Sequence, residues 1–300
     1  MRSVIFIFKW LMFLLIFTNS LFTYADENLF GYLKGAETLP KESWEMYQFL
    51  TSRTDKGVGT YKALDSKTEI EYGVTDRFTS GVSFKMQSIE SKDILLDAYI
   101  PKDINSGFQF SGVEASFKYN FLSPAKDDIG FSTYFSISRG WLDSHSGQKK
   151  DTTSTELEFL LQKYFLEGEL ILVGNFGLES TYAERYQIDG LPSGFEWPTH
   201  PEMEIGFKVG TGITYRFIPK WFFGGEVLYE SEYETEVGQE RFSTFAGPTI
   251  HYGSEKWWST VTYFQQLAGG GPPYAGQENT NLHLIEKTKQ EIRLKLGYNF

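Results

Sequence analysis

The last ten residues of the chain alternate without a break between two kinds of side chain. One set is Glu291, Arg293, Lys295, Gly297 and Asn299, and the apolar set between them is Ile292, Leu294, Leu296, Tyr298 and Phe300. A period of two predicts a β-strand with two different faces, because successive side chains of a strand point in opposite directions. Such a strand fits a membrane barrel or a soluble sandwich, so the rest of the chain has to distinguish the two.

Strand-like patterns recur along the chain, with no convincing amphipathic helix between them. The expected strands are residues 44–54, 60–74, 78–87, 107–121, 129–141, 153–165, 169–182, 203–217, 221–231, 241–252, 257–267 and 284–300. Along the segment 203–217, Ile205, Phe207 and Val209 share one face, and the other face is polar or small. The alternation suggests a bulge near Phe110.

The connections between these strands follow a rhythm. Every second connection is tight, at residues 75–77, 166–168, 219–220 and 253–256, with a longer member at 120–128. The intervening connections are mostly long and polar, at 88–106, 142–152, 183–202, 232–240 and 268–283, and only 55–59 is short. Short turns on one rim and long loops on the other are typical of outer-membrane barrels, with the short turns periplasmic and the long loops extracellular. We therefore expect an all-β chain forming a single antiparallel transmembrane β-barrel of about 12 strands.

Composition supports this fold. Aromatic residues make up 17% of the chain, while mean hydropathy is only −0.32, which excludes a polytopic helical membrane protein. Many aromatic residues lie beside the tight turns. A bilayer interface favours aromatic rings at the strand ends, whereas the core of a soluble sandwich would place them in the middle of the strands. The aromatic residues beside the tight turns are Trp44, Phe78, Tyr119, Phe121, Tyr164, Phe165, Phe217, Trp221, Trp257, Trp258, Tyr298 and Phe300.

The first residues are typical of an export signal. Arg2 precedes a run that is apolar from Val4 to Phe17 except for Lys9, and small residues near Ala25 suit cleavage. We expect residues 1–25 to be a signal peptide, since the run is short for an uncleaved anchor, which is the alternative. Residues 26–43 are then a periplasmic N-terminal lead-in, and the barrel comprises residues 44–300.

The polar face of so wide a barrel is expected to line a wet lumen, because about 12 strands leave more space than side chains fill. The candidate lumen-lining residues are Glu69, Glu71, Lys85, Glu114, Lys118, Glu156, Glu158, Lys208, Arg216, Glu226, Glu230, Glu291, Arg293 and Lys295. Facing rows of opposite charge would orient small polar solutes in a pore. An internal salt-bridge network that braces or fills the barrel is the alternative, and the sequence does not choose between them.

Several motifs of the chain contain residue types that can carry chemistry. Asp143-Ser144-His145-Ser146 places Ser and His side by side, so in an extended strand they point to opposite faces and make a poor nucleophilic pair. No metal-ligand spacing or cofactor motif emerges, so no catalytic, metal or cofactor site is expected. An acidic loop, 230–240, suits divalent cations or simple solvation. The Gly/Pro loop 269–274 suits an inward constriction or an ordinary surface loop.

The mature chain resembles the bacterial outer-membrane β-barrel superfamily. The resemblance lies in the alternating last strand, which ends in Phe300. The chain is also similar to an uncharacterised family of that kind, on Asn28-Leu29-Phe30-Gly31-Tyr32 and Trp44-Glu45-Met46-Tyr47-Gln48. The resemblance implies an outer-membrane location and makes Tyr298 and Phe300 a signal for the barrel-assembly machinery. It also implies periplasmic chaperones, outer-membrane lipid and lipopolysaccharide as partners.

The sequence leaves two functions open, and neither is enzymatic. The first is a passive porin-like channel for small polar solutes, and the second is a structural or surface-interaction protein with a filled lumen. A barrel lipid hydrolase is a weaker third alternative. The formal charge of −11 argues against nucleic-acid binding, and with no cysteine the chain has neither disulfides nor thiolate sites.

Overall fold

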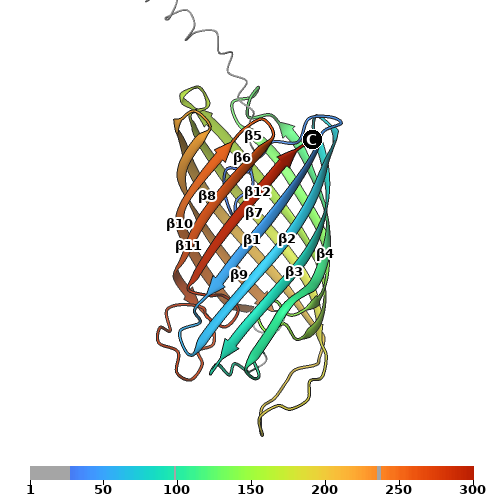
Figure 1. Ribbon diagram of the computed structural model, residues 1–300, viewed down its shortest axis with the longest axis vertical. Coiled ribbons are helices and arrows are strands. Elements are labelled where there is room, and N and C mark those ends of the chain that lie inside the picture. Colours follow the sequence, from blue (N-terminus) through green and yellow to red (C-terminus); the bar gives the residue numbers. More distant parts are fainter. Residues whose placement is uncertain (1–27, 98, 235–237) are drawn as a thin grey trace, which may run out of the picture.

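The computed structural model describes residues 28–97, 99–234 and 238–300, which form one closed antiparallel barrel of twelve strands (Figure 1). Each strand pairs with its neighbours in the chain, and β12 closes the barrel by pairing with β1. The strands are β1 Trp44–Thr54, β2 Thr60–Thr75, β3 Phe78–Lys92, β4 Ile104–Leu122, β5 Gly130–Leu142, β6 Lys149–Phe165, β7 Leu170–Arg185, β8 Glu202–Ile218, β9 Trp221–Glu234, β10 Gly238–Gly253, β11 Trp257–Gly270 and β12 Gln290–Asn299. The expected signal peptide lies outside the described residues.

The expected strands are all present, and their ends at the tight turns agree to within one residue. Most strands run further toward the long loops than expected, because hairpin pairing continues where the side chains are no longer apolar. The last strand is the exception. The expected strand 284–300 begins only at Gln290, and Leu284 and Ile285 are buried in a folded loop. The bulge expected near Phe110 is confirmed by register shifts between β3 and β4.

The apolar face of the barrel points outward. Ile205, Val209 and Ile213 of β8 are 50%, 47% and 49% exposed, whereas the inward Glu158 and Glu226 are 0% and 2% exposed. A soluble sandwich would bury its apolar face and expose its charges. The opposite arrangement matches a barrel wall that meets hydrocarbon, with its polar groups inside.

Tight turns and long loops lie at opposite ends of the barrel, which we call the tight-turn end and the long-loop end. The C-terminus lies at the tight-turn end, where Phe300 N donates to Trp44 O at 3.0 Å (Figure 1). Most of the expected aromatic residues at this end are exposed or half-buried on the outer face. Two differ: Trp258 is 1% exposed and its indole donates to Glu45, and the Tyr164 hydroxyl donates to Glu37. In the part of the chain that the structure describes, no helix is long and apolar enough to span a membrane.

Candidate functional site

The lumen contains residues 28–39 of the chain itself, which we call the inner segment (Figure 1). The carbonyl of Asn28 accepts a hydrogen bond from Thr260 at 2.6 Å, and the Leu39 amide donates to Thr79 at 2.9 Å. Thr260 and Thr79 lie near the tight-turn ends of β11 and β3, so the inner segment enters and leaves the barrel at that end. The sequence predicts a periplasmic lead-in at residues 26–43, and residues 28–39 of this range lie inside the barrel.

Glu226 of β9 holds the middle of the inner segment. Its carboxylate accepts the backbone N–H groups of Gly31, Tyr32 and Leu33 at 2.8, 2.9 and 3.1 Å. The Thr262 hydroxyl donates to the same carboxylate at 2.8 Å. Three consecutive amides with no strand partner are thus satisfied by one buried side chain, which is the condition for burying an irregular backbone.

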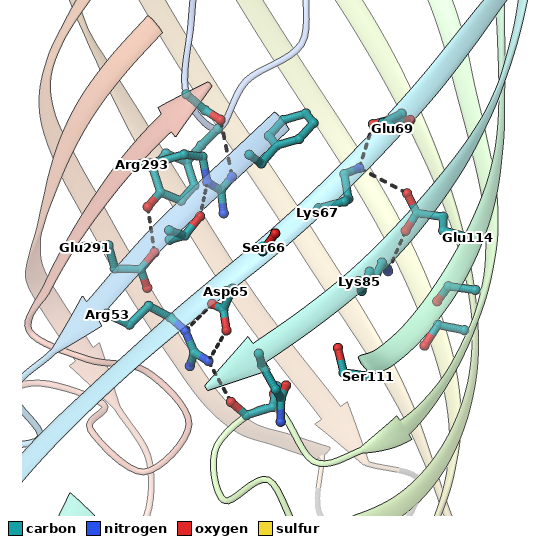
Figure 2. A pocket seen from close by; sticks show the side chains of 18 of the residues that line it. Arg53, Asp65, Ser66, Lys67, Glu69, Lys85, Ser111, Glu114, Glu291 and Arg293 are labelled. Atoms are coloured by element: carbon teal, nitrogen blue, oxygen red, sulfur yellow. Dashed lines mark hydrogen bonds and ion pairs between the residues drawn. The ribbon is translucent and has the colours of Figure 1, made fainter. Parts of the chain in front are cut away.

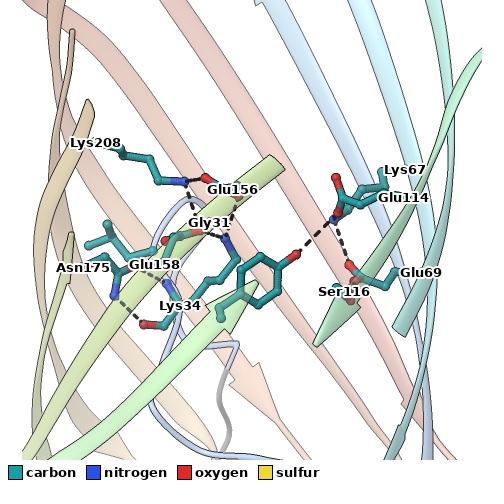
Figure 3. A network of polar contacts seen from close by, with 12 residues as sticks. Gly31, Lys34, Lys67, Glu69, Glu114, Ser116, Glu156, Glu158, Asn175 and Lys208 are labelled. Carbon is teal, nitrogen blue, oxygen red and sulfur yellow. Dashed lines mark hydrogen bonds and ion pairs between the residues drawn. The ribbon is translucent and has the colours of Figure 1, made fainter. Parts of the chain in front are cut away.

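Further wall side chains bind the backbone of the inner segment. Asn175 of β7 accepts from Lys34 N at 2.7 Å and donates to Lys34 O at 2.9 Å (Figure 3). Gln162 of β6 accepts from Ala36 N at 2.7 Å. The Ala36 carbonyl accepts from Asn120 at 2.7 Å and also from Ser132. The backbone is therefore held from β3 round to β7 as well as from β9 and β11.

Tyr32 fills a slot in the wall. Its ring stacks on Phe264 of β11 with centroids 4.1 Å apart, and the guanidinium of Arg293 lies 3.8 Å over its centroid. The hydroxyl donates to Glu291 at 2.7 Å. Stacking, a cation–π contact and a charge-assisted hydrogen bond act on one side chain.

Lys34 contributes the charge contact of the inner segment. Its ammonium pairs with Glu158 of β6 and lies 4.0 Å from Glu156. Lys208 of β8 donates to Glu156 at 2.6 Å and to Glu158 at 3.1 Å (Figure 3). Two ammonium groups thus balance two carboxylates on this wall, which is what burial of such charges requires.

Apolar side chains of the inner segment pack against β7, β8 and β9. Phe30 and Leu33 join a buried cluster that includes Val173 and Leu228. The inward glycines of β8 make room for them. A Cβ on Gly212 would lie 2.6 Å from Phe30 Cε1, and one on Gly210 would collide with Leu33. Gly210 and Gly212 are therefore explained by what lies in the lumen.

A second charged network covers the wall formed by β2, β3 and β4. Lys67 pairs with Glu69 at 2.8 Å and with Glu114 at 3.3 Å, and Glu114 also pairs with Lys85 at 2.7 Å (Figure 2). This network faces the Glu156–Glu158–Lys208 group across the lumen (Figure 3). Tyr134 contacts residues on both sides, because its hydroxyl donates to Glu114 at 3.5 Å and the Lys34 ammonium lies 4.2 Å from its ring centroid. The facing rows of charge expected from the sequence are present, and they are also internally paired.

A cavity of about 660 Å³ lies between the inner segment and the long-loop end. Its lining contains Gly31, Tyr32, Leu33 and Lys34 on one side and Ser144 and His145 of a loop on another. It also reaches Ser111 of β4 and Gly140 of β5. These residues lie at the long-loop end of the pairing between the two strands, where the last paired residues are Gly112 and Gly140. The lining carries both signs of charge, so the site suits polar solutes rather than apolar ones.

Loops fold over the long-loop end. Arg53 bonds Asp65 at 2.6 and 2.9 Å and the carbonyl of Ser144 at 2.7 Å (Figure 2). Lys56, buried in the loop after β1, donates to the carbonyls of Leu284, Ile285 and Lys287 at 3.3, 2.5 and 3.1 Å. Burial, with Arg53 nearby, lowers the pKa of Lys56 to about 7. These contacts tie the loops after β1, β5 and β11 together.

The candidate lumen residues all belong to the inward face, but they do different things. The cavity is lined by Glu69, Glu71, Lys85, Glu114, Lys118, Lys208, Glu230, Glu291, Arg293 and Lys295. Glu156 lines a smaller adjoining pocket, Glu158 and Glu226 bind the inner segment, and Arg216 lies 3.6 Å from Glu169 near the tight-turn end. Sequence reasoning missed Asn120, Gln162 and Asn175, whose only signal was an amide side chain on the inward face.

The other marked motifs have structural partners. In the acidic loop, Glu230 pairs with Lys287 at 2.6 Å, and Glu232 and Glu240 both pair with Arg241; Glu236 lies outside the described residues. The Ser146 hydroxyl donates to Asp143 at 2.9 Å rather than to His145. In the Gly/Pro loop, most of residues 271–281 are exposed, and the inward part begins at Leu282. The exposure of residues 271–281 fits the surface-loop alternative, and the buried part of this connection is residues 282–288.

Known structures share this fold. The COG4313 outer membrane channel from Pseudomonas putida F1 matches with a TM-score of 0.58 and 14% identity, covering 88% of this chain and 98% of that one. The β domain of the Bordetella autotransporter BrkA matches with a TM-score of 0.55 and 10% identity, covering 87% and 100%. The comparison with curated proteins gives no match. A family model described as a family of unknown function, DUF6662, matches residues 22–300. The fold is that of outer-membrane β-barrels, in agreement with the location expected from the sequence.

Proposed function

We propose that this chain, which belongs to the DUF6662 family of unknown function, is an outer-membrane channel for small polar solutes that its own inner segment holds closed. The observation that carries the proposal is the inner segment itself, bound through polar contacts beside a charged cavity of about 660 Å³. A barrel needed only for structure could fill its lumen with side chains, whereas a bound segment can be withdrawn.

The position of the inner segment supports withdrawal toward one side. Asn28 and Leu39 both contact the wall near the tight-turn end, so the segment can leave without passing the folded loops. With both termini in the periplasm, as the strand number and turn pattern favour, that side is the periplasm. Tyr298 and Phe300 at the same end would present the assembly signal to the barrel-assembly machinery, and lipopolysaccharide would contact the apolar wall near the long loops.

Single-channel recording in planar bilayers tests the proposal. The mature chain is compared with a Phe30→Ser, Leu33→Ser variant, which weakens the apolar contacts of the inner segment and leaves the wall intact. Trypsin cleavage after Lys34 reports withdrawal, and Leu33→Met serves as the control because it keeps the apolar volume. We expect rare steps from the mature chain and from Leu33→Met, and frequent steps from the double variant.

The alternative function makes a different prediction for the same variant. If trypsin cleaves the double variant after Lys34 and no steps appear, the channel is refuted. A structural or surface-interaction barrel, braced by its internal ion pairs and folded loops, then accounts for the molecule better.

A further inference from the structure

We infer that the lumen wall is a binding site for short peptides, and that the inner segment is the occupant of this site in the present conformation. The inference rests on the proposed function, since it names short peptides as the solute class that a withdrawn segment would admit. It is carried by how the wall recognises the segment, which is mainly through the peptide backbone.

The contacts to the backbone come from buried polar side chains distributed around the barrel. Glu226 takes three consecutive amides, and Asn175 binds both the N–H and the carbonyl of Lys34. Gln162 and Thr79 accept the amides of Ala36 and Leu39. Thr79, Gln162, Asn175 and Glu226 are 2%, 1%, 3% and 2% exposed, so each would be left with unsatisfied polar atoms if the lumen held no polar partner or water.

Recognition of side chains is confined to fewer positions. Tyr32 has the slot between Phe264 and Arg293, and Lys34 has Glu158. Residues 31–34 also line the cavity of about 660 Å³, so this part of the backbone has open space beside it. A site that binds backbone groups and leaves side-chain space tolerates many sequences, because every peptide offers the same N–H and carbonyl groups.

The covalently attached inner segment competes strongly with any free peptide. A short tether gives an effective concentration of about a millimolar, so free peptides bind the mature chain poorly until the segment leaves. The Phe30→Ser, Leu33→Ser variant weakens this competitor and keeps every wall residue. It is therefore the protein in which the site can be measured.

The test measures binding of three labelled hexapeptides to that variant in detergent micelles. The first has the sequence of residues 29–34, Leu-Phe-Gly-Tyr-Leu-Lys. The second carries alanine at the Tyr32 and Lys34 positions. The third keeps every side chain but is N-methylated at the amides that Glu226 accepts. We expect the second to bind more weakly than the first but still measurably, and the third to bind at least about tenfold more weakly than the second or not at all.

Two results would overturn the inference. Loss of binding by the alanine peptide comparable to that of the methylated one would mean that the wall recognises only its own segment. Equal binding by all three would mean that the backbone contacts do not matter. Glu226→Ala in the same variant should abolish the difference between the first and third peptides, while Glu179→Ala should preserve it. Single-channel recordings without peptide test the channel proposal on their own. A failure of peptide binding can therefore be distinguished from a failure of the channel.

Discussion

Glu226 replaces water for three consecutive backbone amides deep inside a membrane protein. Such amides cannot be buried without an acceptor, and the irregular inner segment has no strand partner to supply one. A carboxylate is well suited, because each oxygen accepts more than one hydrogen bond and a charged acceptor binds more strongly. The stability of the inserted segment should depend on this residue more than on any single apolar contact.

Replacement of Glu226 by alanine should favour the withdrawn state. Three buried N–H groups then lose their acceptor, at a cost of about 1–3 kcal/mol, which shifts the equilibrium by about tenfold to a hundredfold. The measurement is the rate of trypsin cleavage after Lys34 in the folded barrel. Glu179→Ala is the matched control, since Glu179 also lines the cavity and bonds Thr181 rather than the inner segment. Equal cleavage of the two variants would contradict the role of Glu226.

Lys56 should make the folded loop at the long-loop end sensitive to pH. Its pKa is lowered to about 7, first by burial and then by Arg53, against the opposing carboxylates of Glu286, Asp143 and Glu291. In the released loop the ammonium keeps its ordinary pKa near 10.5, so between about pH 7 and 10.5 the released state binds the extra proton. Release therefore becomes harder as pH rises through this window, by up to about tenfold per pH unit.

Hydrogen exchange of residues 282–288, corrected for intrinsic rates, measures this effect. Protection between pH 7 and pH 9 should rise more steeply in the mature chain than in Lys56→Met, because raised carboxyl pKa values in the same loop network, such as that of Glu286, affect both proteins alike. The same pH dependence in both proteins would show that Lys56 does not control the loop.

Among the elements, β8 illustrates how the lumen contents shape the wall. Its inward glycines follow from the space that Phe30 and Leu33 occupy, since a Cβ on Gly212 would lie 2.6 Å from Phe30 Cε1. Gly206 is different, because a Cβ there would meet only Glu179 Cβ at 3.5 Å, an ordinary contact.

Gly212→Val should therefore expel the inner segment, whereas Gly206→Ala should not. Overpacking of this kind costs about 1–3 kcal/mol, and withdrawal of the segment relieves it without unfolding the barrel. We expect more frequent single-channel steps from Gly212→Val than from the mature chain. Unchanged recordings from a Gly212→Val barrel that folds normally would contradict the packing described here.

The strands were predictable from sequence and the inner segment was not, for a physical reason. A strand with one face in lipid and one in water carries a period-two pattern over many residues, as in 203–217, and its turns repeat. Residues 28–39 have no period, because each of them meets a different part of the wall. The sequence predicts that the charged residues share one face of the strands. It does not predict that Glu226 binds the amides of residues 31–33, since these lie 193 to 195 positions away along the chain. The sequence predicts strand at the buried Leu284 and Ile285, because a folded loop and a strand both bury apolar residues.

At the scale of the whole molecule, the outward apolar wall is the feature that makes a bilayer the environment of the barrel. Val209 lies midway along β8 and is 47% exposed, while Phe217 lies one residue from its tight-turn end. An arginine on the lipid face costs about 2–4 kcal/mol at the bilayer centre and about 0–1 kcal/mol near the interface.

Val209→Arg should thus destabilise the barrel in lipid vesicles much more than Phe217→Arg. Urea unfolding monitored by aromatic fluorescence gives both values relative to the mature chain. Equal destabilisation at the two positions would mean that the depth assigned to β8 in the membrane is wrong.

The position of the inner segment in the lumen underlies both proposals, and a chain without cysteine allows a clean test of that position. Paired cysteines replacing Leu33 and Gly210, where a Cβ on Gly210 would touch the Leu33 side chain, are oxidised in barrels folded into vesicles. We predict that this pair forms an intramolecular disulfide, detected by mass spectrometry of the intact barrel, while the pair replacing Leu33 and Gly206 forms none. A folded, vesicle-inserted barrel in which both pairs stay reduced would contradict the account.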